Sequence, residues 1–141
     1  MIAVIDYKAG NLTSVVKALA YLGAQDIRIT QDPADVLRAS KIVLPGVGHF
    51  QSTQLLTDLG LTQATREAVA NGIPFLGICV GLQWLYAGST EAPDTPAATL
   101  YGGPFTGAVE RANVMGVQFH PEKSGATGLQ VLSNFLEWKP C

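Results

Sequence analysis

Residues 74–86 read PFLGICVGLQWLY, and this stretch predicts a strand, a tight turn and a helix in succession. The apolar run Pro74–Ile78 is typical of a buried parallel strand, and Leu82–Tyr86 continues as a helix. Cys79 stands at the turn between them, with a glycine two residues away on either side. A nucleophile on such a turn has strained dihedral angles and needs neighbours without a Cβ atom. The stretch therefore predicts an open α/β sheet with a thiol at a helix N-terminus, where the helix dipole favours the thiolate.

A second motif, His120-Pro121-Glu122, supplies an imidazole and a carboxylate. The run Val114–Phe119 predicts a strand that ends at His120, and sites in open α/β sheets form at the carboxyl ends of strands. With Pro121 fixing the backbone, Glu122 is expected to return to the imidazole, hold its tautomer and stabilise the imidazolium that forms when Cys79 gives up its proton. Together these side chains predict a catalytic triad of Cys79, His120 and Glu122.

Two members of this triad, Cys79 and His120, also have a plainer interpretation. Cysteine is among the most buried residue types, so Cys79 alone is consistent with a structural side chain in the core. His120 alone is consistent with a hydrogen-bonded histidine at a sheet edge. His49 is a competing candidate for the base, but it lacks a carboxylate partner nearby in the sequence. The triad is favoured because a thiol, an imidazole and a carboxylate occur together in a chain with only two cysteines and two histidines.

A glycine loop, Pro45-Gly46-Val47-Gly48, follows the predicted strand Lys41–Leu44. By itself it reads as a turn. If it lies beside the Cys79 turn, backbone N–H groups from this loop and from Val80 point at one place and stabilise the oxyanion of a tetrahedral intermediate. The candidate oxyanion hole consists of Val47, Gly48 and Val80.

The composition favours one domain spanning residues 1–141. The net charge is −2 and the basic residues are scattered, so nucleic acid is not an expected partner. Two cysteines form no disulfide framework, and Cys141 is expected to be a free thiol in a reducing compartment. The uncharged stretch Ala68–Thr90 is interrupted by Asn, Gly and Pro, so no membrane span is expected. Met1 runs directly into a strand without a signal peptide, and we predict a cytoplasmic protein.

Strands and helices alternate as far as Tyr86, which is typical of a doubly wound parallel sheet. A linker-like stretch at 91–98, rich in proline and small residues, follows. Phe105–Glu110 is predicted to form a β-hairpin with the strand before His120, and Gly128–Glu137 closes the chain as an amphipathic helix. We predict an α/β fold: a flavodoxin-like open parallel sheet with helices on both faces and a small antiparallel part near the C-terminus. The earlier strands are expected at Ile2–Asp6, Ile27–Ile29, Lys41–Leu44 and Pro74–Ile78, and the helices from near Asn11, from Asp32 and over Thr62–Ala70.

With these motifs assembled, the chain resembles class I (triad) glutamine amidotransferases and, within that class, the glutaminase subunits of imidazole glycerol phosphate synthase. The resemblance spans nearly the whole chain. It rests on Ile5-Asp6-Tyr7 with Gly10-Asn11-Leu12 and Ser14, on Leu44-Pro45-Gly46-Val47-Gly48, on Gly77-Ile78-Cys79-Val80-Gly81-Leu82-Gln83, and on Gly116-Val117-Gln118-Phe119-His120-Pro121-Glu122-Lys123-Ser124.

The resemblance implies a reaction and a role for each matching residue. Cys79 attacks the carboxamide of glutamine, His120 carries the proton to the leaving ammonia, and Glu122 orients His120. The ammonia passes to a (β/α)8 barrel, the cyclase subunit, for imidazole glycerol phosphate synthesis in histidine biosynthesis. No cofactor and no metal are expected. The residues implied to touch the substrate or the partner are Gln83 for glutamine, and Lys123 and Asn11 for the barrel.

The chain departs from this family in its middle region. Family members carry a long segment with a Pro-His-x-Gly-Trp stretch toward the barrel and a His-Ser-Tyr stretch that contacts glutamine, whereas this chain passes from Glu91 to Tyr101 in ten residues. We therefore expect weak turnover, and self-association or dependence on a partner. Two other functions stay open: an independent cysteine hydrolase of small amides or esters, and a catalytically impaired or non-catalytic docking module of the same fold.

Overall fold

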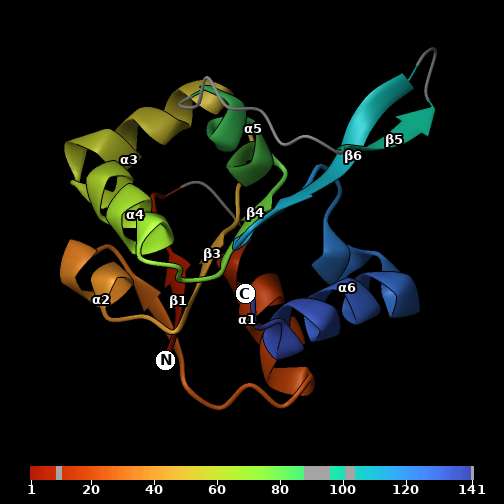
Figure 1. Ribbon diagram of the computed structural model, residues 1–141, viewed down its shortest axis with the longest axis horizontal. Coiled ribbons are helices and arrows are strands. Elements are labelled where there is room, and N and C mark those ends of the chain that lie inside the picture. The colour runs from red at the N-terminus through yellow and green to blue at the C-terminus, as the bar shows by residue number, and fades with distance from the viewer. Residues whose placement is uncertain (9–10, 88–95, 101–103, 141) are drawn as a thin grey trace.

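The computed structural model describes residues 1–8, 11–87, 96–100 and 104–140, and these form one seven-stranded sheet flanked by helices (Figure 1). The strand order is β2-β1-β3-β4-β7-β6-β5. The strands from β2 to β7 in this order are parallel, and β6 and β5 extend the sheet in antiparallel pairing. The order of the parallel part is that of flavodoxin-like sheets. The predicted fold class is confirmed, including its antiparallel part near the C-terminus.

Helices connect the parallel strands, because parallel neighbours need a crossover connection. The strands are β1 Ile2–Ile5, β2 Ile27–Thr30, β3 Lys41–Leu44, β4 Phe75–Ile78, β5 Pro96–Leu100, β6 Pro104–Arg111 and β7 Val114–Val117. The α-helices are α1 Leu12–Tyr21, α2 Pro33–Leu37, α3 Gln54–Asp58, α4 Leu61–Ala70, α5 Val80–Ala87 and α6 Gly125–Glu137. Two short 3-10 helices, η1 Phe50–Thr53 and η2 Pro121–Lys123, complete the described elements.

The central strands are buried on both faces, which explains their continuous apolar sequences. Ile42 and Leu44 of β3 belong to the core shared with α2, α3 and α4, whereas Val43 between them faces the core shared with α1 and α6. Figure 1 shows the two layers, with α2, α3 and α4 on one side of the sheet and α1 and α6 on the other. The alternation of side chains along each strand thus fixes which helix covers which face.

Two helix starts follow directly from the capping residues in the sequence. The side chain of Asn11 accepts a hydrogen bond from the backbone N–H of Ser14 at 3.3 Å, and α1 begins at the next residue. Asp32 likewise accepts from the backbone N–H of Ala34 at 2.8 Å, with Pro33 as the first residue of α2. Each cap satisfies an N–H group that has no partner within its helix. The helices predicted from Asn11 and Asp32 are therefore confirmed.

The predicted strand before His120 is too long. The sequence pattern predicts a strand through Phe119, but β7 ends at Val117. The reason lies in the neighbouring strand, because β4 pairs with β7 only as far as Ile78 and the chain then turns away at Cys79. Beyond this point β7 has no neighbouring strand on the β4 side, so the strand ends. His120 therefore comes after a bend that follows β7 and is not its last residue.

The linker-like stretch is also partly a strand. Its residues from Pro96 onward belong to β5, which pairs with β6, while residues 88–95 lie outside the described part. Proline is tolerated at the first position of a strand at a sheet edge, so composition alone misled the prediction. The predicted free thiol at Cys141 also lies outside the described residues. Helix α3 was not predicted, and α6 begins three residues before Gly128.

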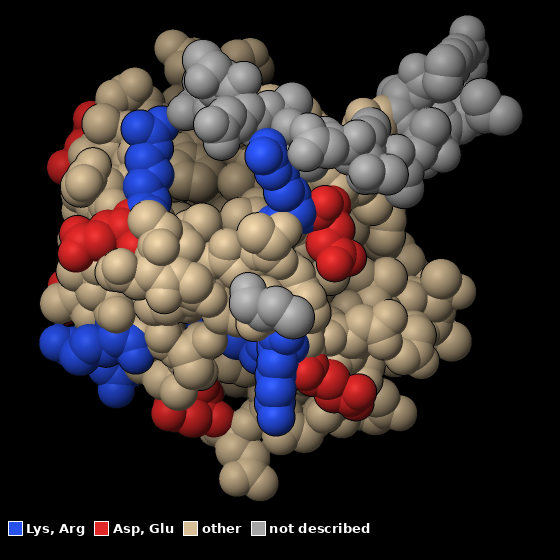
Figure 2. Space-filling view, in the orientation of Figure 1, with Lys and Arg blue, Asp and Glu red and all other residues tan. Residues whose placement is uncertain are grey.

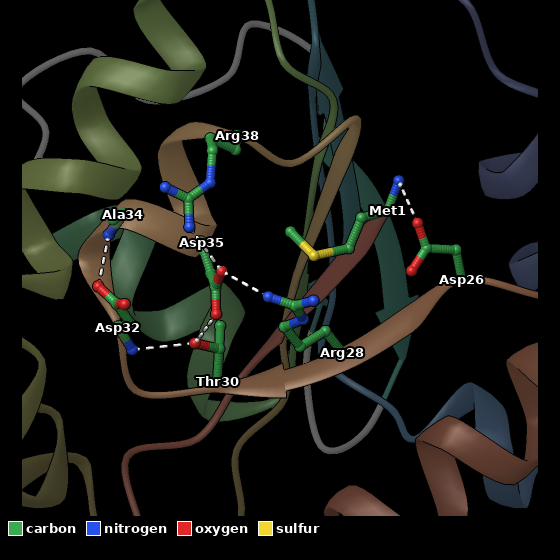
Figure 3. Close-up of polar contacts among 8 residues, drawn as sticks. All are labelled: Met1, Asp26, Arg28, Thr30, Asp32, Ala34, Asp35 and Arg38. Atoms are coloured by element: carbon green, nitrogen blue, oxygen red, sulfur yellow. Dashed lines mark hydrogen bonds and ion pairs between the residues drawn. The ribbon is translucent and has the colours of Figure 1, made fainter.

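A polar network closes the β2 edge of the sheet around the buried carboxylate of Asp35 (Figure 3). Arg28 and Arg38 donate to Asp35 Oδ1 at 2.9 and 3.0 Å. The Thr30 hydroxyl donates to Oδ2 at 2.9 Å and accepts from the backbone N–H of Asp32 at 2.9 Å. The Thr30 hydroxyl and then the two guanidinium groups hold the pKa of Asp35 below its ordinary value, although burial acts to raise it. The network therefore fastens α2 to β2.

Replacing Asp35 with Asn should make the melting temperature of the chain depend less on pH in the acid range. Because the pKa of Asp35 is lowered in the folded chain, the carboxylate stabilises the fold above the ordinary aspartate pKa of about 4. That contribution is lost as the pH falls through the lower folded value. Melting temperatures measured from pH 7 to pH 2 should show D35N below the parent at pH 7 and close to it at the acid end. The exposed Asp58, varied to Asn, is the control, and an equal acid dependence of D35N and the parent would contradict the prediction.

The charged side chains are dispersed over the face shown in Figure 2, where basic and acidic groups alternate without a patch of one sign. This distribution agrees with the prediction that basic residues are scattered. None of the helices among the described residues is long and apolar enough to cross a membrane.

Candidate active site

Cys79 stands on a sharp turn between β4 and α5. Its φ angle is 56°, in the left-handed region that side chains other than glycine rarely adopt. The backbone N–H of Cys79 donates to Val117 at the end of β7 at 2.7 Å. Its carbonyl accepts from Leu82 and Gln83, which are the first backbone hydrogen bonds of α5. The residue therefore begins the helix, half-buried rather than sealed in the core, and the strained nucleophile turn has the geometry that the sequence predicts.

The flanking glycines are required by close backbone packing. A Cβ atom on Gly77 would lie 2.6 Å from the carbonyl oxygen of Gly81. A Cβ atom on Gly81 would lie 2.0 Å from the carbonyl oxygen of Leu44 at the end of β3. Real Cβ atoms do not approach backbone atoms this closely. Because the atoms in the way belong to the backbone, they cannot move aside as the end of a side chain could. The two glycines thus allow α5 to start directly over the ends of β3 and β4.

His120 and Glu122 form a hydrogen-bonded pair next to this turn. His120 Nδ1 lies 2.9 Å from Glu122 Oε1, and the Glu122 side chain is only 1% exposed. A carboxylate on Nδ1 fixes the proton there and leaves Nε2 free to accept one. The second carboxylate oxygen, Oε2, has no hydrogen-bond partner among the described residues. Among the described residues, the hydrogen bond of this carboxylate therefore goes to His120, and the two side chains are paired as the sequence predicts.

The hydrogen bond of the Cys79 sulfur goes to a residue for which the sequence patterns predict no role. Gln118 Nε2 donates to Cys79 Sγ at 3.6 Å, and within the described part of the chain no hydrogen bond joins the thiol to His120. All three residues nonetheless lie at the carboxyl ends of adjacent strands, because Ile78 pairs with Val117 across β4 and β7. The structure thus brings the thiol and the His120–Glu122 pair to the same end of the sheet, where the parallel strands have their carboxyl ends.

The glycine loop after β3 packs against the start of α5. A Cβ atom on Gly46 would lie 2.6 Å from Val80 Cβ and 3.3 Å from the backbone nitrogen of Gly81. Gly48 has a φ angle of 95°, which glycine adopts without strain. Val80 stands in the first turn of α5, whose N–H groups have no partner within the helix. The loop is therefore beside the Cys79 turn, as the oxyanion-hole hypothesis for Val47, Gly48 and Val80 requires.

Tyr7 lies beneath this loop and is almost completely buried. Its hydroxyl would be 2.4 Å from a Cβ atom on Gly46, and it has no hydrogen-bond partner among the described residues. Burial, and then the nearby charge of Cys79, raise the pKa of Tyr7 to about 12. The hydroxyl is therefore neutral at physiological pH and leaves the site without a negative charge behind the sulfur.

The remaining predicted site residues are exposed. Gln83 lies on α5 and donates to Gln118 Oε1 at 3.4 Å. Asn11 caps α1, and Lys123 lies in η2, which contacts both α6 and α1. His49 caps η1 by accepting a hydrogen bond from the backbone N–H of Gln51 at 3.2 Å, which gives it a local structural role. Among the described residues, His49 has no hydrogen bond to a carboxylate.

Comparison with known proteins places this site in a family. Residues 3–93 match the model of the class-I glutamine amidotransferases. The chain belongs to this family. It is 35% identical to the imidazole glycerol phosphate synthase subunit HisH of Caulobacter vibrioides, with 99% of both chains covered. It is 36% identical to the HisH subunit of Herpetosiphon aurantiacus, with 97% of this chain and 94% of the relative covered.

These HisH relatives contain residues that this glutamine amidotransferase lacks. The alignment with the Caulobacter protein runs over 210 residues, whereas this chain has 141. The family match ends at residue 93, close to the point where the resemblance predicts the shortening. Its exact place, between Glu91 and Tyr101, stays a prediction.

Two solved structures share the fold of this amidotransferase. A glutamine amidotransferase has a TM-score of 0.71 and 16% identity over 97% of this chain and 98% of its own. A putative GMP synthase component from Thermoplasma acidophilum has a TM-score of 0.62 and 21% identity, with 96% of this chain and 92% of its own covered. At these identities the likeness concerns the fold alone.

Sequence reasoning missed two polar residues near the nucleophile: Gln118, which bonds to the sulfur, and Tyr7, whose pKa responds to the charge of Cys79. Both residues belong to stretches that resemble the family, but the sequence patterns assign neither of them a role. No local sequence pattern marks Gln118, because its contact depends on the register of the sheet, in which it follows β7 directly as Cys79 follows β4. Residues at matching positions after paired parallel strands emerge side by side. Across the described residues no group of three or more His, Cys, Asp or Glu side chains is arranged to hold a metal ion.

Proposed function

We propose that this chain is the glutaminase subunit of an imidazole glycerol phosphate synthase, acting in histidine biosynthesis in the cytoplasm as one domain. The observation that carries the proposal is the strained Cys79 at the start of α5, beside the His120–Glu122 pair at the end of the neighbouring strand. The likeness to HisH subunits over nearly the whole chain supports the pathway.

The proposed reaction proceeds in two steps through a thioester. His120 accepts the Cys79 proton, and the thiolate attacks the carboxamide carbon of glutamine. Backbone N–H groups of the glycine loop and Val80 stabilise the oxyanion, and the bond to nitrogen breaks as His120 returns the proton to the departing ammonia. A water, deprotonated by His120, then attacks the thioester and releases glutamate and the free thiol. In this scheme Glu122 holds His120 and Gln83 contacts the bound glutamine.

The proposed partner is a (β/α)8 barrel cyclase that receives the ammonia. Asn11 and Lys123 are both exposed, and they follow the carboxyl ends of β1 and β7. Because α1 contacts η2, the two residues lie on neighbouring elements at the same end of the sheet as Cys79. A partner docked on this end would therefore receive ammonia directly from the site.

The proposal predicts labelling of Cys79 by a glutamine-analogue electrophile, and weak release of glutamate that a cyclase partner increases. The weak activity is expected because the relatives carry a segment missing here, and a site with fewer substrate contacts binds the transition state less well. Peptide mass spectrometry locates the label, a coupled assay measures glutamate, and sedimentation detects self-association. Brisk hydrolysis by a strictly monomeric chain without a partner would contradict the expected dependence.

A second candidate function is that of a docking module, which has the same fold and binds the cyclase but does not hydrolyse glutamine. The length difference from the HisH relatives is the observation that favours it. A chain that binds the cyclase but is not labelled at Cys79 would support this alternative. Hydrolysis of small esters or amides, with none of glutamine, would instead indicate an independent cysteine hydrolase.

A further inference from the structure

Gln118 bridges the nucleophile and the residue proposed to contact the substrate. Its Nε2 atom donates to Cys79 Sγ at 3.6 Å, a normal distance for a sulfur acceptor. Its Oε1 atom accepts from Gln83 Nε2 at 3.4 Å, at the long end for such a bond. One amide group thus touches the sulfur on one side and the side chain of Gln83 on the other.

The backbone holds Gln118 firmly in this place. Its N–H donates to Gly107 of β6 at 2.8 Å, and the preceding carbonyl, that of Val117, accepts from the N–H of Cys79 at 2.7 Å. The side chain is half-buried, so its rotamer freedom is restricted by the surrounding strands. Gln118 and Cys79 are therefore fixed to each other through the main chain as well as through the side chain.

An amide suits this position for a chemical reason. It donates a hydrogen bond but cannot act as a base, so it stabilises a thiolate without competing for its proton. The other titratable groups near the sulfur are Tyr7, which is neutral, and the His120–Glu122 pair, which has no hydrogen bond to it in the described structure. Gln118 is thus the neutral donor to the nucleophile.

We infer that Gln118 is a positioning residue, which holds the Cys79 thiolate through its N–H and the Gln83 side chain through its oxygen, and so sets the spacing between nucleophile and substrate contact. Only the part concerning Gln83 rests on the proposed function. The effect on the sulfur is a property of the thiol alone and can be measured without glutamine.

Alkylation of Cys79 by iodoacetamide tests the inference in the full chain. Q118M keeps the length of the side chain but has no donor, and Q118E places an acidic acceptor beside the sulfur. A hydrogen bond to a charged group corresponds to about a ten-fold change in thiolate population or more, so Q118M should slow the labelling of Cys79 near pH 7 by about ten-fold. Q118E should slow it further, and the rise of the labelling rate with pH should move to higher pH in both variants.

Controls in the same samples separate positioning from folding. Labelling of Cys141 is the internal reference, and Q130M is the matched variant because Gln130 lies on α6 and bonds to Asn134 instead. Q118M should also lower kcat for glutamine more than it changes KM, while the melting temperature stays near that of the parent. Labelling of Cys79 in Q118M as fast as in the parent, or faster, overturns the inference. Normal labelling of the parent with no release of glutamate would refute the proposed function and leave the inference standing.

Discussion

Replacing Cys79 with Ala is expected to abolish glutamine hydrolysis and to leave the chain folded. Loss of a covalent nucleophile typically lowers turnover by ~10⁴-fold or more, since no neighbouring group forms the thioester in its place. The side chain is half-buried and its neighbours keep their packing, so the melting temperature should change little. Glutamate release measured with and without the cyclase, together with a thermal melt, checks both parts.

The matched control is Cys141→Ala, which removes the other thiol of the chain and should not affect hydrolysis. Glu122→Gln should fall between the parent and C79A, because the amide still packs against His120 but no longer stabilises its charge. Hydrolysis by C79A within a few-fold of the parent would remove Cys79 from the mechanism. Unfolding of C79A would favour the interpretation of Cys79 as a structural cysteine.

Gly81→Ala is expected to damage both stability and activity. The new Cβ atom would lie 2.0 Å from the carbonyl oxygen of Leu44, so α5 must move away from β3. Overpacking against the backbone of a central strand should lower the free energy of unfolding by about 3 kcal/mol or more. For a chain of this length the melting temperature would fall by on the order of 10 °C. Glutamate release should be lost as well, because the same shift displaces Cys79 and Val80.

Gly72→Asn is the control for this prediction. Unlike Gly81, Gly72 has a positive φ angle, 85°, but a Cβ atom there meets nothing within 4 Å, and asparagine tolerates this conformation. Its effect on stability should be about 1 kcal/mol or less. If G81A melts at the temperature of the parent and hydrolyses glutamine normally, α5 does not pack against β3 as closely as the structure shows.

The sequence contains most of what is needed to derive the candidate site. Cys79 could be placed because an apolar strand, a glycine-bounded turn and a helix stand next to one another in the chain. His120 and Glu122 could be paired because Pro121 restricts the backbone between them, and the 2.9 Å contact agrees with that expectation. The oxyanion-hole residues and the contacts to glutamine and the cyclase remain predictions, since each depends on a bound molecule.

Local patterns failed where the outcome depends on a distant part of the chain. β7 ends at Val117 because β4, some forty residues earlier, turns away at Cys79. Pro96–Leu100 becomes a strand because β6 offers an unpaired edge, although residues 96–98 belong to the stretch whose composition is typical of a linker. In both cases hydrogen bonds between strands outweigh the intrinsic preference of the segment.

By itself the sequence determined most of the periodic apolar elements, the caps of α1 and α2 and the strained turn at Cys79, because each is fixed by interactions within a few residues. Only the tertiary structure decided which strand ends meet, and hence that Gln118 rather than His120 bonds to the thiol and that Tyr7 lies beneath Gly46. Those contacts join residues from different strands. Their geometry follows from the register of the sheet and the packing of α5, which no local pattern specifies.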